Sequence, residues 1–234
     1  MKFNALVFGL IAVILTFSSC VSKKKYNSLL SEKESLEMRM KTTPKTPNKD
    51  EQLKGELQRK DAELDAIRAK IKESNDKIQK LKAAIEQAFA DSQNPDIQIQ
   101  EKNGKLYVIL PNQILYKSGS ADLDAKGIEM IETIAAIFIK NQGLDIDVEG
   151  HTDNVPISTK KYADNWDLSV ARAVNVVRKL TDSKVNPARL SAVGNGEFYP
   201  IIDNSTPENR QQNRRTEFVI TPKITGLYQL LNDL

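Results

Sequence analysis

The sequence predicts an α+β fold, an α/β sandwich of βαβαβ type with helices on one face of a mixed sheet, preceded by a long helical coiled-coil stalk. Three observations predict it. Residues 50–93 carry a seven-residue apolar repeat, which is typical of a coiled-coil helix. After residue 96, segments that alternate in polarity follow segments with helical spacing. Turn sequences separate these segments, so residues 96–222 are expected to form one domain, with residues 223–234 as a short tail.

The chain begins with a segment typical of a secretory signal. A lysine at position 2 precedes an apolar or small run, Ala5–Phe17, which is too short for a membrane span of about 20 residues. The run is followed by Ser18-Ser19-Cys20, which resembles the lipobox of bacterial lipoproteins. This resemblance implies a signal peptide over residues 1–19 and acyl chains on Cys20 as a lasting lipid anchor. By the same resemblance, Val21 in place of an Asp favours the outer membrane.

Two helical segments are expected between the lipid anchor and the domain. Residues 20–49 form a lipidated, flexible or helical linker that Pro44 and Pro47 interrupt. The coiled-coil segment, residues 50–93, is expected to oligomerise through its a positions, or else to lie back on the domain as a lone amphipathic helix. Those a positions are Leu57, Leu64, Ile71, Ile78 and Ile85. Polar d positions at Lys60 and Ser74 are expected to specify register at some cost in stability.

Composition argues against several functions. The net charge is +3 and 28% of the residues are charged, which gives no case for nucleic acid as a partner. With one cysteine and one histidine in the chain, neither an internal disulfide nor a structural zinc site is expected. A catalytic Ser, His and Asp set around His151 would lack the Gly-x-Ser-x-Gly nucleophile turn. We therefore expect no enzyme activity, no metal and no cofactor.

The domain is expected to open with a hairpin. Residues 97–100 alternate in polarity, Asn103-Gly104 is a strong hairpin turn, and Leu106–Leu110 is apolar. Asp122 or Asp124 is expected to cap the next helix. The apolar face of that helix comprises Ile128, Ile131, Ile134, Ala135 and Phe138. Residues 144–150 then alternate as a half-exposed strand.

A second helix is expected to begin at Asn165, acting as its N-cap. Its core face comprises Val170, Ala173, Val174, Val177 and Leu180. Two more strands are expected at residues 190–193 and 216–221, separated by a polar loop that runs to Asn213. Pro222 ends the last strand.

One carboxylate and one guanidinium lie at the edges of these elements. Asp153 follows strand 144–150, and Arg172 lies on the second helix, on a face that it shares with Asn165 and Leu168. A carboxylate suits an ammonium group, and the planar fork of Arg suits a carboxylate. The pair is therefore expected to bind a zwitterionic centre, the alternative being an internal salt bridge between Asp153 and Arg172.

Five motifs in order carry a resemblance to a known family. They are Tyr116-x-Ser118-Gly119-Ser120-Ala121-x-Leu123, Gly150-His151-Thr152-Asp153-Asn154, Asn165-x-x-Leu168-Ser169-x-x-Arg172-Ala173, Arg189-Leu190-Ser191-Ala192-Val193-Gly194, and Asn204 with Arg210-x-x-Asn213-Arg214-Arg215. They resemble the OmpA-like C-terminal domain, which outer-membrane proteins, the peptidoglycan-associated lipoprotein and the flagellar stator protein MotB share. The length of the loop before Asn165 resembles the MotB branch.

The resemblance implies noncovalent binding of peptidoglycan through the diaminopimelate of its stem peptide. By that resemblance, Asp153 meets the ligand ammonium and Arg172 meets a ligand carboxylate. The further ligand-binding residues that we expect are Thr152, Asn165, Leu168 and Arg214. Arg214 and Arg215 either touch the ligand or brace the fold.

These features predict an outer-membrane lipoprotein whose periplasmic domain binds peptidoglycan and tethers that membrane to the cell wall. The alternative is a wall-anchoring component of a larger envelope, motor or transport complex. A MotB-like stator would need a transmembrane helix with an ionisable residue, and Ala5–Phe17 has neither the length nor an acid.

Overall fold

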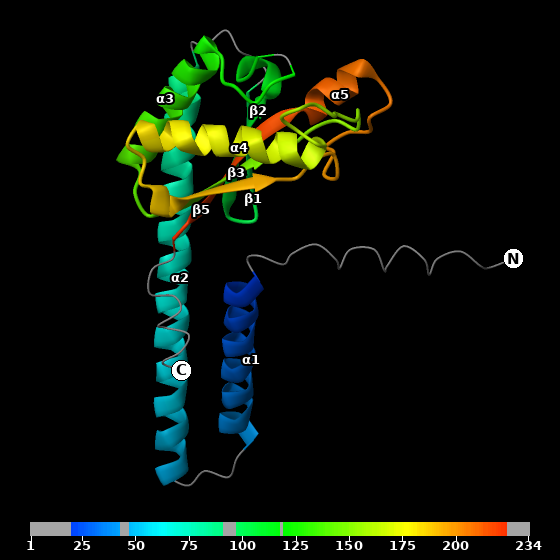
Figure 1. Ribbon diagram of the computed structural model, residues 1–234. Helices are drawn as coiled ribbons and strands as arrows, with labels where there is room; N and C mark the ends of the chain where they lie inside the picture. Colours follow the sequence, from blue (N-terminus) through cyan, green and yellow to red (C-terminus); the bar gives the residue numbers. More distant parts are fainter. Residues whose placement is uncertain (1–19, 43–46, 91–96, 118, 224–234) are drawn as a thin grey trace, which may run out of the picture. The chain divides into compact units, whose positions relative to one another are not determined.

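The computed structural model describes residues 20–42, 47–90, 97–117 and 119–223 (Figure 1). The predicted signal peptide, the joint at Pro44 and the tail from residue 224 lie outside these residues. None of the helices in the described ranges is both long and apolar enough to cross a membrane. The described residues divide into two compact units, one up to Lys72 and one from Glu73 to Lys223.

The first unit is a helical hairpin of α1 (Cys20–Thr42) and the first part of α2 (Pro47–Phe89). Leu29, Leu64 and Ile67 form its buried apolar cluster. An early residue of α1, Tyr26, bonds to Arg68, whereas the later Lys33 bonds to Asp61 at 2.6 Å. The two helices therefore run antiparallel. Exposed ion pairs contribute little, so the apolar cluster supplies most of the stability of the hairpin.

Three of the five predicted a residues in the heptad seam of α2 are buried against other residues of the same chain. Leu64 lies in the hairpin cluster, whereas Ile78 and Ile85 are buried in the core of the second unit. Two seam residues are less covered, since Leu57 is half-buried and Ile71 is 36% exposed. A homo-oligomer through this seam stays a prediction, and it would have little apolar surface left to use.

A five-stranded mixed sheet in the order β1-β2-β5-β3-β4 is the centre of the second unit (Figure 1). The strands are β1 (Gln98–Lys102), β2 (Lys105–Pro111), β3 (Leu144–Gly150), β4 (Leu190–Gly194) and β5 (Arg215–Pro222). The β3–β4 pair is parallel and the other pairs are antiparallel. The β1–β2 hairpin turns at Asn103 and Gly104, which both have positive φ, as a tight hairpin turn requires. The predicted α+β class and mixed sheet are confirmed.

Helices cover one face of this sheet, as predicted. Val108 pairs with Phe218, which pairs with Val148, and all three side chains enter the same core. The main covering helices are α3 (Ala125–Lys140) and α4 (Asn165–Asp182), with shorter helices η1 (Asn112–Ile114), η2 (Pro187–Arg189) and α5 (Pro207–Asn213) in the connections. The expected core face of α3 is confirmed except at Ile128, which is 38% exposed.

The N-cap prediction is confirmed for α3 and wrong for α4. The Asp124 carboxylate accepts a hydrogen bond from the Gly127 amide at 2.7 Å. In α4 the cap is Asp164, whose carboxylate accepts from the Asp167 amide, and Asn165 is the first helical residue. An Asp at N-cap satisfies the free amides as well as an Asn does, which leaves the Asn165 side chain for other contacts.

The predicted core face of α4 is confirmed at Ala173 and Leu180, which are fully buried, and wrong at Val170, which is 42% exposed. Ser169 and Val176 are buried there as well. The physical reason lies in two glycines of the sheet, because a Cβ on Gly150 would come within 2.2 Å of the Ser169 carbonyl oxygen. A Cβ on Gly194 would likewise meet Val170. The helix approaches the sheet through small residues, so the largest apolar side chains do not mark its buried face. The seven-residue helix α5 lies within the segment expected to be a polar loop.

Arg189 holds the end of α3 to the sheet. It is 6% exposed, and its guanidinium donates to the carbonyl oxygens of Phe138, Asn141 and Leu144 at 2.8–2.9 Å. Two of these oxygens belong to residues at the α3 C-terminus, where carbonyls lack helical partners. Replacing Arg189 with lysine is expected to lower the free energy of unfolding by about 2–4 kcal/mol, because buried acceptors lose charged donors. Urea denaturation measures this, with the exposed Arg178→Lys as a control that changes stability by less than about 0.5 kcal/mol.

Candidate ligand-binding site

The site lies where the chain leaves β3 and enters α4. Thr152 and Asp153 lie two and three residues after the end of β3 and are buried, at 4% and 6% exposure. The Thr152 amide donates to the Gly196 carbonyl at 2.8 Å, and its hydroxyl donates to the Asp153 carbonyl at 2.9 Å. Thr152 therefore fixes the loop backbone that presents Asp153.

The Asp153 carboxylate already has two partners in the chain. One oxygen, Oδ1, accepts from the Val155 amide at 3.1 Å. The other, Oδ2, pairs with Arg214 Nη1 at 2.5 Å. An internal salt bridge therefore exists, formed with Arg214 instead of the Arg172 that the sequence suggested. The Arg214 side chain remains 40% exposed, so it lies at the surface of the site.

Asn165 organises the loop around Asp153. Its side-chain amide donates to the carbonyls of Asp153 at 3.3 Å and Val155 at 3.1 Å, and to Glu197 Oε2 at 2.5 Å. One side chain thus joins the β3–α4 loop to the segment after β4. Leu168, the other predicted residue on this helix, is buried one turn before Arg172.

Arg172 is 5% exposed and only partly satisfied. Its Nε donates to the Ser120 carbonyl at 3.0 Å, and its guanidinium carbon lies 5.2 Å from the centre of the Tyr116 ring. Burial lowers the pKa of this guanidinium, and the charges of Tyr116, Arg214 and Asp153 also act on it. Its Nη1 is buried and has no hydrogen-bond acceptor among the described residues. A buried charged donor without an acceptor costs free energy and suits an anionic ligand group.

A chain of buried hydrogen bonds holds the backbone of Arg172 in place. The Tyr116 hydroxyl lies 3.3 Å from the Arg172 carbonyl oxygen and 3.0 Å from Thr216 Oγ1. Thr216 in turn donates to Asn112 Oδ1 at 3.0 Å. The motif Tyr116-x-Ser118-Gly119-Ser120 marks Tyr116 in the sequence but does not predict these hydrogen bonds. The Ser120 carbonyl and Glu197 carried no sequence signal, because backbone acceptors and isolated surface acids have no distinctive pattern.

The OmpA family matches residues 115–214, which contain all these residues except Asn112 and Thr216. The chain carries an OmpA family domain. This family is not one of enzymes, in agreement with the expectation that the domain has no catalytic activity.

The alignments with similar proteins are longer than the segment 115–214 that matches the OmpA family. Motility protein B of Bacillus subtilis is 30% identical over 150 residues, covering 63% of this chain and 58% of the relative. The probable lipoprotein YiaD of Escherichia coli is 29% identical over 126 residues, covering 54% and 56%. The cell wall anchor of the T6SS from Pseudomonas aeruginosa is 29% identical and superposes with a TM-score of 0.55, covering 58% of this chain and 96% of that structure. The chain spans little more than half the length of Motility protein B and of YiaD.

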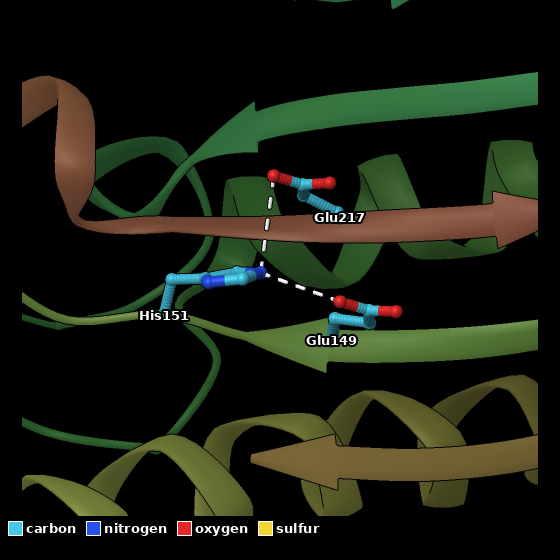
Figure 2. A group of neighbouring side chains, drawn as sticks. All are labelled: Glu149, His151 and Glu217. Carbon is cyan, nitrogen blue, oxygen red and sulfur yellow. Dashed lines mark ion pairs between the residues drawn. The ribbon is translucent and has the colours of Figure 1, made fainter. Parts of the chain in front are cut away.

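Within the residues that the structure describes, one group of side chains that could ligate a metal ion lies at the sheet of the second unit (Figure 2). His151 Nε2 lies 3.6 Å from Glu149 Oε2 and 3.8 Å from Glu217 Oε1. Each of these oxygens already accepts from the protein, Glu217 from Arg215 Nε at 2.6 Å and Glu149 from Asn195 at 2.8 Å. The nearby His151 ring lowers the pKa of Glu149. These contacts join β3, β5 and the residue that follows β4. Arg215 therefore braces the fold.

Ionisation of Tyr116 is expected to destabilise the OmpA domain in base. Burial raises the pKa of Tyr116 to about 12, whereas an unfolded tyrosine ionises near pH 10. The folded form therefore loses stability as the pH rises from about 10 towards 12, by up to roughly 2–3 kcal/mol. Urea unfolding at several pH values measures this. Tyr116→Phe should cost about 1–2 kcal/mol at pH 7 and abolish this part of the loss, and an unchanged loss would contradict the assignment.

Proposed function

We propose that the OmpA domain binds peptidoglycan noncovalently, through the diaminopimelate of its stem peptide. The observation that carries this proposal is Arg172 Nη1, a buried guanidinium nitrogen that has no acceptor among the described residues, within the electrostatic influence of the buried Asp153 carboxylate. Diaminopimelate carries an ammonium and a carboxylate on the same carbon at its free end. In this proposal the carboxylate accepts from Arg172 and the ammonium donates to Asp153.

The present partners of Asp153 are compatible with a ligand ammonium. An ionised carboxylate offers about four acceptor sites, and in this structure Val155 and Arg214 each use one. Arg214 supplies the opposite charge next to the buried carboxylate, whose burial without a partner would be costly. We assign Arg214 to this holding role at the rim, with Thr152 and Asn165 positioning the loop and Leu168 supporting the helix.

Affinity for a single stem peptide is expected to be modest. Charge-assisted hydrogen bonds contribute about 1.5–3 kcal/mol each, and association costs several kcal/mol. A few such bonds correspond to micromolar to millimolar dissociation constants. Firm attachment to a polymer would then depend on several domains held together at the membrane, since linked binding events raise the overall affinity.

The cellular role that we favour is a wall-anchoring component of a larger envelope complex. Its support is the likeness to Motility protein B and to the cell wall anchor of the T6SS. A second candidate is an outer-membrane lipoprotein that tethers the membrane to the wall. The Ser-Ser-Cys20 sequence and the likeness to the probable lipoprotein YiaD favour that role. Both roles place the domain in the periplasm, bound to peptidoglycan.

Cosedimentation with purified peptidoglycan tests the shared activity. The chain without residues 1–20 is expected to sediment with diaminopimelate-type peptidoglycan and to be released by free diaminopimelate. Asp153→Asn should weaken retention, whereas Asp182→Asn, on the exposed end of α4, should not. Absence of wild-type retention would refute the proposal, and equal retention of Asp153→Asn would refute the assigned site.

Metabolic labelling with a palmitate analogue addresses the anchor in the full chain. Label that is incorporated in the wild type and lost in Cys20→Ala supports lipidation at this residue. A wild-type chain that takes up no label would exclude the lipoprotein role and leave the complex-bound role.

A further inference from the structure

Two aromatic rings are exposed beside the candidate site. Trp166, the second residue of α4, is 44% exposed, and Phe198, after β4, is 59% exposed. Their rings are stacked, with centroids 5.2 Å apart and an interplanar angle of 23°. We call these two side chains the aromatic pair. Exposed apolar side chains that contact one another, unlike those scattered singly, can mark an interaction surface.

The surrounding backbone holds the aromatic pair in place. Both rings lie over Gly196, which has a positive φ of 53°, and a Cβ there would meet them at 3.4–3.5 Å. The Ser169 hydroxyl donates to the Trp166 carbonyl at 2.9 Å and accepts from the Gly196 amide at 3.0 Å. A single buried hydroxyl thus fixes both segments that carry the rings. The pair is therefore presented as a pre-formed surface, which lowers the entropy cost of binding.

The aromatic pair adjoins the proposed diaminopimelate site through Asn165. This residue precedes Trp166 directly, and its amide bonds to Glu197, the residue before Phe198. Trp166 and Arg172 are six positions apart on α4, which corresponds to about 9 Å along the helix axis. A ligand that extends from Arg172 along the start of α4 would therefore reach the rings.

The chemistry of peptidoglycan supplies such an extended ligand. Diaminopimelate is joined to the glycan strand through a short spacer of about two amino-acid residues and a lactyl group. At about 3.3–3.6 Å per extended residue, the spacer spans roughly 7 Å before the lactyl group is counted. A sugar ring would thus lie roughly 10 Å from the bound diaminopimelate, which is similar to the axial separation of about 9 Å between Trp166 and Arg172 on α4.

We propose that the aromatic pair binds a sugar ring of the glycan strand, an inference that rests on the proposed binding of diaminopimelate. One face of a pyranose ring carries mainly C–H groups, and its slightly positive hydrogens suit the negative face of an aromatic ring. The neighbouring Val155, which is 53% exposed, adds uncharged surface that suits a neutral sugar. The domain therefore binds both the stem peptide and the glycan strand of the same peptidoglycan unit.

Trp166 provides a direct readout because it is the one tryptophan of the chain. Glycan strands freed of stem peptides by an amidase are added to the chain without residues 1–20, and its fluorescence is recorded. Saturable change in the emission of the wild type is expected, with binding weakened at least about fivefold in Phe198→Ala. The control Ile139→Ala removes a similarly exposed apolar side chain from α3 and should bind as the wild type does.

A diaminopimelate-containing tripeptide separates the two proposals. Phe198→Ala should bind this tripeptide with unchanged affinity while it binds whole peptidoglycan more weakly. If the wild type binds the tripeptide but glycan strands leave the fluorescence unchanged, the glycan site is wrong and the proposed function stands. Tripeptide that fails to bind the wild type refutes the proposed function and with it this inference. Self-association that is lost in Phe198→Ala, without any effect of glycan, would assign the aromatic pair to a contact between copies and overturn the proposal.

Discussion

Replacing Arg172 with lysine is expected to weaken binding of a diaminopimelate-containing wall peptide by about tenfold to a hundredfold. Lysine keeps the positive charge but lacks the planar fork that binds a carboxylate through two nitrogens. The loss of one charge-assisted bond is worth about 1.5–3 kcal/mol, and about 1.4 kcal/mol corresponds to a tenfold change. Titration calorimetry of the purified variant measures it.

Arg172 also contacts the Ser120 carbonyl and the Tyr116 ring, so its substitution could disturb the fold. Thermal unfolding of Arg172→Lys, followed by circular dichroism, shows whether the variant is folded at the temperature of the titration. Arg178→Lys is the matched control, because Arg178 is exposed on the same helix and should leave affinity unchanged. A folded Arg172→Lys variant with wild-type affinity would remove Arg172 from the site.

Replacing Gly150 with alanine is expected to cause the largest loss of stability, at least about 3 kcal/mol. The new Cβ would lie 2.2 Å from the Ser169 carbonyl oxygen and 3.0 Å from its carbon. These are backbone atoms, so no side-chain rotation relieves the clash and α4 must move away from β3. Overpacking in a close-packed interior typically costs about 1–3 kcal/mol, and more where the blocking group cannot move.

Urea denaturation of the chain measures the effect of Gly150→Ala. Gly55→Ala is a suitable control, because it lies in α2 and a Cβ there meets nothing within 4 Å. That control should stabilise its helix by about 0.5–1 kcal/mol. Because α4 carries Arg172 and Asn165, Gly150→Ala should also reduce ligand binding. Stability equal to the wild type would show that β3 and α4 are less closely packed than described.

The parts of the fold that the sequence predicts are those with a strong local signal. The two-residue alternation of β3, the Asn103-Gly104 turn and the Asp124 cap each depend on neighbouring residues. The face of α4 depends instead on the sheet opposite it, where Gly150 and Gly194 admit small residues. Helix α5 had a local signal in Thr206-Pro207, since Thr206 caps it and Pro occupies its first turn. That signal was outweighed by the polarity of the segment.

The candidate site likewise combines residues that the sequence predicts with contacts that no local pattern predicts. Asp153, Asn165 and Arg172 were expected to share a site, and the bond from Asn165 to the Asp153 carbonyl and the electrostatic effect of Asp153 on Arg172 place them together. The pairing of Asp153 with Arg214 joins residues 61 positions apart, and no local pattern predicts a contact between two loops. The role of Tyr116 likewise depends on Thr216, a hundred positions away.

The central claim is that Asp153 and Arg172 recognise the zwitterionic end of diaminopimelate. Calorimetric titration of the wild-type chain without residues 1–20 tests it, using two wall tripeptides that differ only in the third residue. Diaminopimelate and lysine both carry the side-chain ammonium, but lysine lacks the carboxylate beside it. We expect measurable binding of the diaminopimelate peptide and binding at least about tenfold weaker for the lysine peptide, the loss of one charged hydrogen bond or more. Equal affinity for the two peptides, or no affinity for either, would contradict the account.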